Sequence, residues 1–219
     1  IITTPAWVSY PEMVKLADAV SVYINTTEEE GFKFTIDKLE KAITNKTKAI
    51  IINSPSNPTG MIYSEEELRA VADLAVSKGI YIVSDEIYEK LIYDGYKHVS
   101  IASFNDKIKD LTIVVNGVSK SYAMTGWRIG YTASNEQIAK IMGNVQSHAT
   151  SNPNSIAQKA ALAALEGPQE IIDIMAAEFV KRRDYMVDRI NSINGLSCIK
   201  PNGAFYVMMN ISKIIGKEL

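Results

Sequence analysis

Cysteine is almost absent from the chain, and histidine is scarce. Cys198 is the single cysteine among 219 residues, which excludes an internal disulfide and any metal cluster built from cysteine thiolates. Such a composition is typical of a reducing compartment, so we expect a cytoplasmic protein. His98 and His148 lie far apart in the sequence and do not favour a zinc site. We expect both to be ordinary loop or helix residues.

Long apolar runs and strong charge bias are also missing. No stretch approaches the roughly 20 apolar residues of a membrane span, and no charged segment followed by an apolar one opens the chain as a signal peptide does. The net charge is −2 and the charges are interspersed, which leaves no basic field for nucleic acid. Neither G-x-G-x-x-G nor G-x-x-x-x-G-K-[ST] occurs, so a nucleotide-binding α/β domain is poorly supported.

The composition that remains, 47% hydrophobic and 22% charged, is that of a globular protein with a sizeable core. The sequence begins with IITTPAW, without an initiator methionine, and ends at KEL just after a strand-like run. We therefore expect a fragment of a longer protein.

Strand-like and helical patterns alternate along the chain. Strands are predicted at 21–24, 49–52, 80–83, 111–115, 129–133 and 203–211, and helices at 10–20, 35–43, 64–79, 135–145, 155–165 and 168–193. The run 49–52 has the continuous apolar character of a strand buried on both faces. This alternation predicts an α/β fold, a three-layer sandwich around a mostly parallel sheet. The long helix and the strand after it suggest a large domain at 1–180 and the start of a smaller one at 181–219.

The stretch IVVNGVSKSYAMTGWRIGY, residues 113–131, carries the most chemistry. Lys120 stands on a loop just after an apolar strand, with Ser119 before it, and Arg128 precedes the next strand. A lysine amine can form a Schiff base with a carbonyl if its surroundings lower its pKa, and an arginine fork suits phosphate or carboxylate. Two ordinary surface cations would give the same pattern.

Polar side chains follow three predicted strands. Asn57 comes after the strand at 49–52, Asp85 and Tyr88 after 80–83, and Lys120 after 111–115. Function collects beyond the carboxyl ends of parallel strands, so these groups are expected to face one cleft. Taken singly, each has an ordinary explanation: the acid as a helix cap, the asparagine as a turn residue, the tyrosine as packing.

Together these motifs resemble a known family. PAWVSYPEM, NSPSNPTG, VSDEIYEKLIYDG, VNGVSKSYAMTGWRIGY and PNGAFYV, in this order, are similar to the class I aminotransferases, fold type I enzymes that use pyridoxal 5'-phosphate. The likeness is greatest to the bacterial aspartate aminotransferases, some of which also accept prephenate or aromatic substrates. It covers essentially the whole chain.

The resemblance implies a double role for Lys120. This lysine would hold the cofactor as a Schiff base and, once substrate displaces it, would shuttle a proton between the substrate α-carbon and the cofactor. A free amine tethered beside an acidic C–H bond suits that task. Asp85 resembles the carboxylate that pairs with the pyridine nitrogen, and a buried anion there keeps the nitrogen protonated.

Five other residues match positions that bind cofactor or substrate in the family. Tyr88 and Asn57 resemble the donors to the phenolic oxygen of the ring, and Asn57 also the contact to the substrate carboxylate. Trp7 resembles the aromatic that stacks on the ring and borders the substrate, although a core tryptophan would give the same pattern. Ser119 and Arg128 resemble phosphate ligands.

The sequence departs from many relatives at two positions. Gly117 stands where they carry a serine three residues before the lysine, and Ser147 stands where dicarboxylate-specific relatives carry an arginine that reaches the neighbouring subunit. The glycine-rich phosphate cradle and the distal-carboxylate lysine would lie upstream of this chain, and the arginine that clamps the α-carboxylate downstream. Asn57–Pro58 matches a cis peptide of the family, and Thr4–Pro5 is a second candidate.

The resemblance implies a homodimeric aminotransferase of amino-acid metabolism that moves an amino group between an amino acid, of aspartate, glutamate or aromatic type, and a 2-oxo acid. Two alternatives stay open: another fold type I activity, such as a C–S lyase or a synthase, and a non-catalytic cofactor-binding sensor domain. The substrate is not determined by this sequence. The 219-residue chain alone is expected to bind cofactor weakly and to lack useful turnover.

Overall fold

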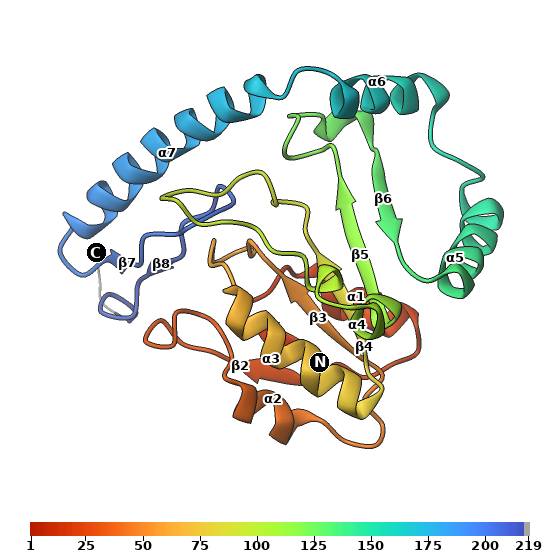
Figure 1. Ribbon diagram of the computed structural model, residues 1–219. Helices are drawn as coiled ribbons and strands as arrows, with labels where there is room; N and C mark the ends of the chain where they lie inside the picture. Colours follow the sequence, from red (N-terminus) through yellow and green to blue (C-terminus); the bar gives the residue numbers. More distant parts are fainter. Residues whose placement is uncertain (217–219) are drawn as a thin grey trace.

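A computed structural model describes residues 1–216 and contains one large sheet and one small one (Figure 1). The strands are β1 (Ile2–Thr4), β2 (Tyr23–Asn25), β3 (Ala49–Asn53), β4 (Tyr81–Asp85), β5 (Thr112–Gly117), β6 (Gly130–Ala133), β7 (Ser197–Cys198) and β8 (Met209–Asn210). The α-helices are α1 (Ser9–Leu16), α2 (Ile36–Ala42), α3 (Glu65–Lys78), α4 (Asp106–Leu111), α5 (Glu136–Ala149), α6 (Ser155–Glu166) and α7 (Glu170–Asn191), with short 3₁₀ helices η1 (Ile101–Ser103) and η2 (Thr125–Trp127).

The large sheet has the strand order β2-β1-β3-β4-β5-β6. Strands β1 to β5 run parallel, and β6 pairs antiparallel with β5 at the edge. The prediction of a mostly parallel α/β sheet is therefore confirmed. The registers bring Asn53 opposite Asp85 and Asp85 opposite Val115, so the carboxyl ends of β3, β4 and β5 lie level at one edge.

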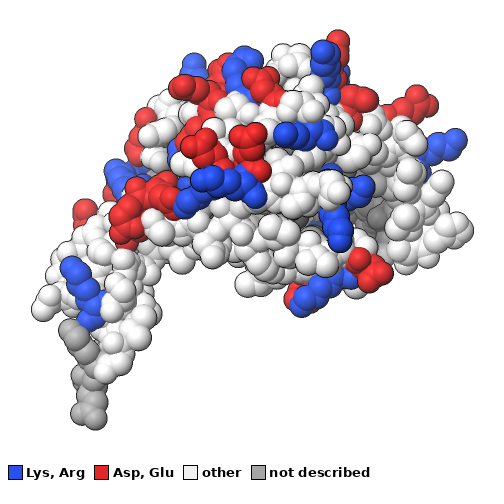
Figure 2. Space-filling view, turned by 90° about the horizontal axis from the view of Figure 1, so that it is seen from below, with Lys and Arg blue, Asp and Glu red and all other residues white. Residues whose placement is uncertain are grey.

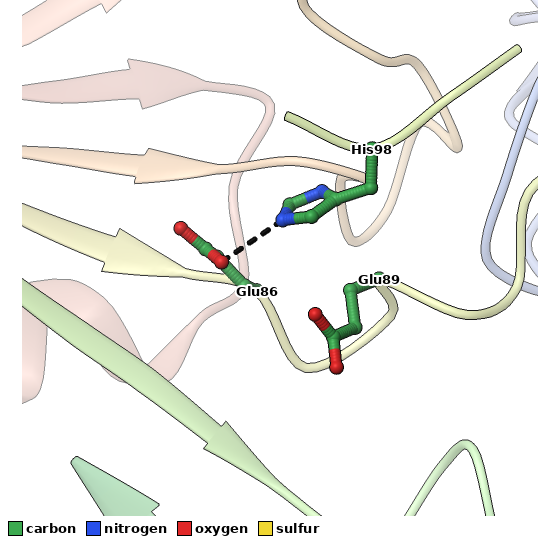
Figure 3. Close-up of side chains that lie close together, drawn as sticks. All are labelled: Glu86, Glu89 and His98. Atoms are coloured by element: carbon green, nitrogen blue, oxygen red, sulfur yellow. Dashed lines mark hydrogen bonds and ion pairs between the residues drawn. The ribbon is translucent and has the colours of Figure 1, made fainter. Parts of the chain in front are cut away.

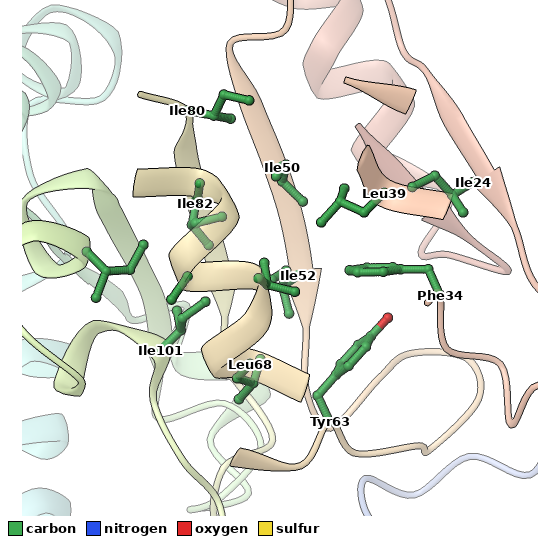
Figure 4. Close-up of a cluster of buried hydrophobic side chains, with 14 residues drawn as sticks. Ile24, Phe34, Leu39, Ile50, Ile52, Tyr63, Leu68, Ile80, Ile82 and Ile101 are labelled. Atoms are coloured by element: carbon green, nitrogen blue, oxygen red, sulfur yellow. The ribbon is translucent and has the colours of Figure 1, made fainter. Parts of the chain in front are cut away.

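The main hydrophobic core lies between one face of this sheet and α2, α3 and α4 (Figure 4). Ile50 and Ile52 of β3 and Ile82 of β4 point into it, whereas Ile51 and Val83 on the opposite face are only half-buried. The expectation that the run 49–52 is buried on both faces is thus wrong for this chain. Burying one Ile or Leu side chain contributes about 1.5–3 kcal/mol, so this one-sided core holds the helices in place.

Local sequence signals set the ends of α3. The Ser64 hydroxyl accepts from the Glu67 backbone N–H at 3.2 Å, and the Glu67 carboxylate accepts from the Ser64 N–H at 2.7 Å. Both halves of the predicted capping box are therefore present. Gly79 ends the helix in the left-handed conformation, with φ 63°. The packed helix fixes the entry to β4, whose last residue is Asp85.

The last predicted strand is largely wrong. Only Met209–Asn210 of the run 203–211 forms a strand, paired with β7 in the small sheet. The N–H groups of Gly203 and Ala204 donate instead to Gly60 and Leu91 carbonyls, each at 2.9 Å, and Ala204 has a positive φ of 56°. These bonds bend the chain and bring the next two residues to the edge of the large sheet. Helix α7 runs unbroken through residue 180.

Candidate active site

Asp85 and Lys120 lie at the same edge of the sheet. Asp85 ends β4, and Lys120 follows β5 by three residues, after the fully buried Val118. Burial raises the pKa of the Asp85 carboxyl; a hydrogen bond from Tyr10 and the nearby Lys120 charge act in the opposite direction. An amine and a carboxylate therefore face one region of the molecule, as the sequence predicts.

The side chain of Asp85 has two donors in place. Its Oδ2 atom accepts from the Tyr10 hydroxyl at 2.6 Å, and its Oδ1 atom accepts from the Ile87 backbone N–H at 3.2 Å. The carboxylate is half-buried. It is held in one orientation, because the two bonds come from different directions in the fold: α1 and the turn after β4.

Lys120 lies among aromatic rings. Its Nζ atom is 5.8 Å from the centroid of the Tyr88 ring and 5.6 Å from that of Phe205. Tyr88 is 3% exposed, and its hydroxyl lies 2.7 Å from that of Tyr206. Burial, with the Tyr206 hydroxyl and the Asp85 charge, raises the pKa of Tyr88, while the Asn57 side chain opposes the rise. Asn57, Tyr88, Asp85 and Lys120 are thus brought together.

Trp7 lies at the same edge but is not a core residue. Its side chain is 39% exposed, and its ring meets that of Tyr10 edge to face, with centroids 5.4 Å apart. Asn57 is anchored through its backbone N–H, which donates to Asn53 at 2.7 Å. The peptides before Pro5 and Pro58 are cis, as the resemblance implies, and so is Ser54–Pro55, which was not anticipated.

The two expected phosphate ligands are placed differently. Ser119 is half-buried beside Lys120. Arg128 is exposed and left-handed, with φ 55°, and its guanidinium donates to the Thr125 carbonyl at 2.9 Å. It lines a surface hollow of about 620 Å³ together with Gly126, Trp127, Gln146, Thr150, Asn152, Pro153, Asn154 and Ala157.

The structure explains the glycine at position 117. A Cβ atom there would lie 2.8 Å from the Ile129 carbonyl oxygen and 3.0 Å from the Gly130 Cα. Real Cβ atoms do not approach that closely. The atoms in the way belong to Ile129 and Gly130, where Gly117 of β5 pairs with Gly130 of β6. A serine at position 117 would therefore require a local shift of this strand pairing.

Three aromatic residues of the site were not predicted. Tyr10, Phe205 and Tyr206 contact the site from segments remote in sequence. Phe205 and Tyr206 belong to the motif PNGAFYV, but nothing in the sequence shows that it folds back onto Tyr88. The one available signal for Tyr10 is its position three residues after Trp7, in the first turn of a helix that begins at Ser9.

A second polar cluster lies next to Asp85 (Figure 3). Glu86, Glu89 and His98 each offer a ligand atom within 4.8 Å of the others. The buried Glu86 carboxylate already accepts from Ser84 at 2.9 Å, Ser100 at 2.7 Å and His98 Nε2 at 2.9 Å. Burial would raise the pKa of Glu86, but the bonds from His98 and Ser100 lower it overall. We assign this network to holding the loop after β4.

Figure 2 shows basic and acidic side chains side by side over one part of this face, next to a broad area without charged side chains. Within residues 1–216, none of the helices combines the length and apolar character that crossing a membrane requires.

Comparisons with known proteins agree with the geometry. The model of the aminotransferase class I and II family matches residues 1–219. The aspartate aminotransferases of Geobacillus stearothermophilus and Bacillus subtilis (strain 168) are each 55% identical over 210 residues, which is 96% of this chain and 53% of each relative. The solved aspartate aminotransferase of Rhizobium meliloti superposes with a TM-score of 0.95 at 41% identity, over 98% of this chain and 54% of that one.

The chain belongs to the class I and II aminotransferase family. Its mostly parallel sheet with flanking helices is the fold of the solved members. The chain spans about half the length of the curated relatives it matches.

Proposed function

We propose that this chain carries the chemical centre of an aspartate-type aminotransferase that uses pyridoxal 5'-phosphate. The observation that carries the proposal is the placement of the Lys120 amine and the Asp85 carboxylate at one sheet edge, close enough to interact electrostatically. The family match and the names of the relatives supply the reaction type. An amino acid and a 2-oxo acid are the substrates.

The donor set fits the cofactor. A substituted pyridine ring needs an anion for its nitrogen, donors for its phenolic oxygen, an aromatic face and an amine for its aldehyde. Asp85 supplies the anion, and Asn57 and Tyr88 supply the donors. Trp7 supplies the aromatic face and Lys120 the amine, and all five residues lie at the same sheet edge. Ser119 and Arg128 are proposed to bind the phosphate. The Arg128 guanidinium has five N–H donors and gives one to the Thr125 carbonyl.

When bound, the cofactor supplies an electron-accepting ring that stabilises the pair left by a breaking Cα–H bond. Lys120 would hold it through the Nζ atom and, once freed by substrate, would take the proton from the substrate α-carbon at the same atom. The aromatic rings of Tyr88 and Phe205 border that amine and limit its contact with water. Trp7 and Asn57 border the substrate, and the Asn57 amide is a donor for its carboxylate.

The activity is tested by mixing the full-length protein with aspartate or glutamate and a 2-oxo acid. Amine transfer to the 2-oxo acid, with the pyridoxamine form appearing in single turnover, is the expected result. Elimination products without that form would favour the lyase alternative. Cofactor binding without turnover of any amino acid would favour the sensor alternative.

We further infer the organisation of the complete protein. The β7–β8 sheet is separate from the six-stranded sheet, which supports a large domain at 1–180 and a small one at 181–219. Ile141, Val145 and Ile156 are each more than half exposed, so a second copy or residues outside this chain are expected to cover them, in line with a homodimer. Free Cys198 supports a cytoplasmic location.

A further inference from the structure

Tyr10 makes two contacts that converge on the site. Its hydroxyl donates to Asp85 Oδ2 at 2.6 Å, across 75 residues of sequence. Its ring meets that of Trp7 at an interplanar angle of 87°. The Tyr10 side chain is 7% exposed, so both contacts are shielded from water. One residue of α1 therefore touches the carboxylate proposed for the ring nitrogen and the aromatic proposed for the ring face.

We propose that Tyr10 is a positioning residue that keeps Asp85 ionised and oriented for the pyridine nitrogen, while its ring packs edge to face against Trp7. The proposal rests on the proposed function. Tyr10 itself does not reach the reacting atoms.

The Tyr10 bond matters because the surroundings of Asp85 otherwise favour a neutral acid. Burial is the main influence on its pKa and raises it, and the neighbouring Glu86 charge acts in the same direction. The groups that act in the opposite direction are the Tyr10 hydroxyl, the Ile87 N–H and the Lys120 charge. Tyr88 and Tyr206 also lie near Tyr10, and burial raises the pKa of Tyr88, which stays neutral.

Lys120 cannot substitute for Tyr10 in this role. The Lys120 amine would be joined to the cofactor in one state and would be a neutral base in the other. In neither state would a free ammonium charge on Lys120 act on Asp85. The Tyr10 hydroxyl is a permanent donor, because burial and the Asp85 charge raise its pKa far above neutral pH. A short bond to a charged acceptor is also stronger than one between neutral groups.

The test uses the full-length protein without cofactor, so that it does not depend on the proposed activity. The protonated carboxyl band of Asp85 is followed by infrared titration and assigned through Asp85→Asn. Tyr10→Phe keeps the ring and its Trp7 contact but removes the hydroxyl, and is expected to raise the pKa of Asp85 by about one unit, a tenfold change in its acid dissociation constant. Tyr10→3-fluorotyrosine, a stronger donor that preserves the shape, is expected to lower it.

Tyr63→Phe is the matched control. Tyr63 is also 7% exposed but belongs to the main core, so its loss is expected to leave the Asp85 titration unchanged. In the cofactor-loaded protein, the pH dependence of the visible absorption should shift in Tyr10→Phe and not in Tyr63→Phe. This readout separates tuning of Asp85 from a general loss of stability.

The proposal is overturned if the pKa of Asp85 in both Tyr10 variants stays within about 0.2 units of its value in the unsubstituted protein. The hydrogen bond from Tyr10 would then not stabilise the ionised carboxylate. If Tyr10→Phe does not fold, the pKa of Asp85 in the Tyr10→3-fluorotyrosine variant alone tests the proposal. Absence of cofactor binding in the unsubstituted protein would instead refute the proposed function, and the infrared result would remain interpretable.

Discussion

Two regions of the large sheet differ in how completely this chain covers them. In the packed region, β3, α3 and β4, one face of each strand is buried and α3 contributes Leu68, Val71, Ala72 and Ala75 to the core. In the exposed region, β6 and α5, all four residues of β6 are exposed, and Ile141 and Val145 of α5 are 55% and 64% exposed. Both regions carry apolar residues at regular spacing.

The difference separates the candidate site residues into two groups. Asp85 is the last residue of β4, in the packed region. Lys120 follows β5, the strand that pairs with β4. Arg128 lies two residues before β6, and its guanidinium donates to the carbonyl of Thr125 in its own turn. We therefore expect contacts within this chain to set the position of Lys120, and whatever covers β6 and α5 in the complete protein to influence that of Arg128.

The largest expected effect distinguishes these two cations. In the full-length protein, Lys120→Ala should lower kcat by at least about 10³-fold, because both the covalent anchor and the proton carrier are lost. Arg128→Ala should mainly weaken cofactor affinity, with most turnover restored at saturating cofactor. Cofactor titrations followed by initial rates measure both, with the exposed Lys90→Ala as control. Lys120→Ala turnover within tenfold of the parent would contradict the assignment.

Next in size is the stability contrast between the regions. Ile82→Ala, at a fully buried site of β4, should lower the free energy of unfolding by about 2–5 kcal/mol. Ile141→Ala, more than half exposed on α5, should change it by less than about 0.5 kcal/mol. Urea unfolding of the 219-residue chain measures both. A large loss in Ile141→Ala would mean that α5 is packed in solution.

Helix caps give a smaller effect. Ser64→Ala removes half of the capping box of α3 and should cost about 1 kcal/mol in global unfolding. Asn135 caps α5 by accepting from the Ile138 N–H at 2.9 Å. Asn135→Ala should raise hydrogen exchange in α5 with little change in the global transition, because few core contacts link that helix to the rest. An equal loss of global unfolding free energy in Ser64→Ala and Asn135→Ala would contradict the contrast between the packed and exposed regions.

The smallest effect concerns two adjacent acids of the packed region. The folded-state pKa of Glu86 is lowered, so its contribution to stability is present above the pKa of the unfolded chain and is lost as the pH falls through the folded value. The folded-state pKa of Asp85 is raised, so its contribution is favourable at low pH and is lost as the pH rises. We measure the urea midpoints of Glu86→Gln, Asp85→Asn and the parent between pH 3 and 7. The difference from the parent should change with pH in opposite directions for the two variants, and a change in the same direction would contradict these pKa shifts.

The sequence predicted the elements whose signals are local. Alternating apolar runs, the Ser64 cap and Gly79 placed β3, α3 and β4, and the parallel order then placed Asn57, Asp85 and Lys120 at one edge. The resemblance added roles that the residues alone left open. The orientation of β6 could not be derived, because an apolar run looks alike in either direction.

Contacts between distant segments could not be predicted. The bond between Tyr10 and Asp85 spans 75 residues and that between Tyr88 and Tyr206 spans 118. The run 203–211 looked like a strand, but backbone bonds from Gly203 and Ala204 to other loops bend it. In each case hydrogen bonds between distant segments determine the local structure, and the periodicity of the sequence does not predict such bonds.

The central claim is that one amine, facing one acid across the space of a single ring, performs the chemistry. Borohydride reduction of the cofactor-loaded full-length protein, followed by peptide mapping with mass spectrometry, tests it most directly. The visible band should bleach and the label should be found on Lys120. A label on any other lysine, with Lys120 unmodified, would contradict the account.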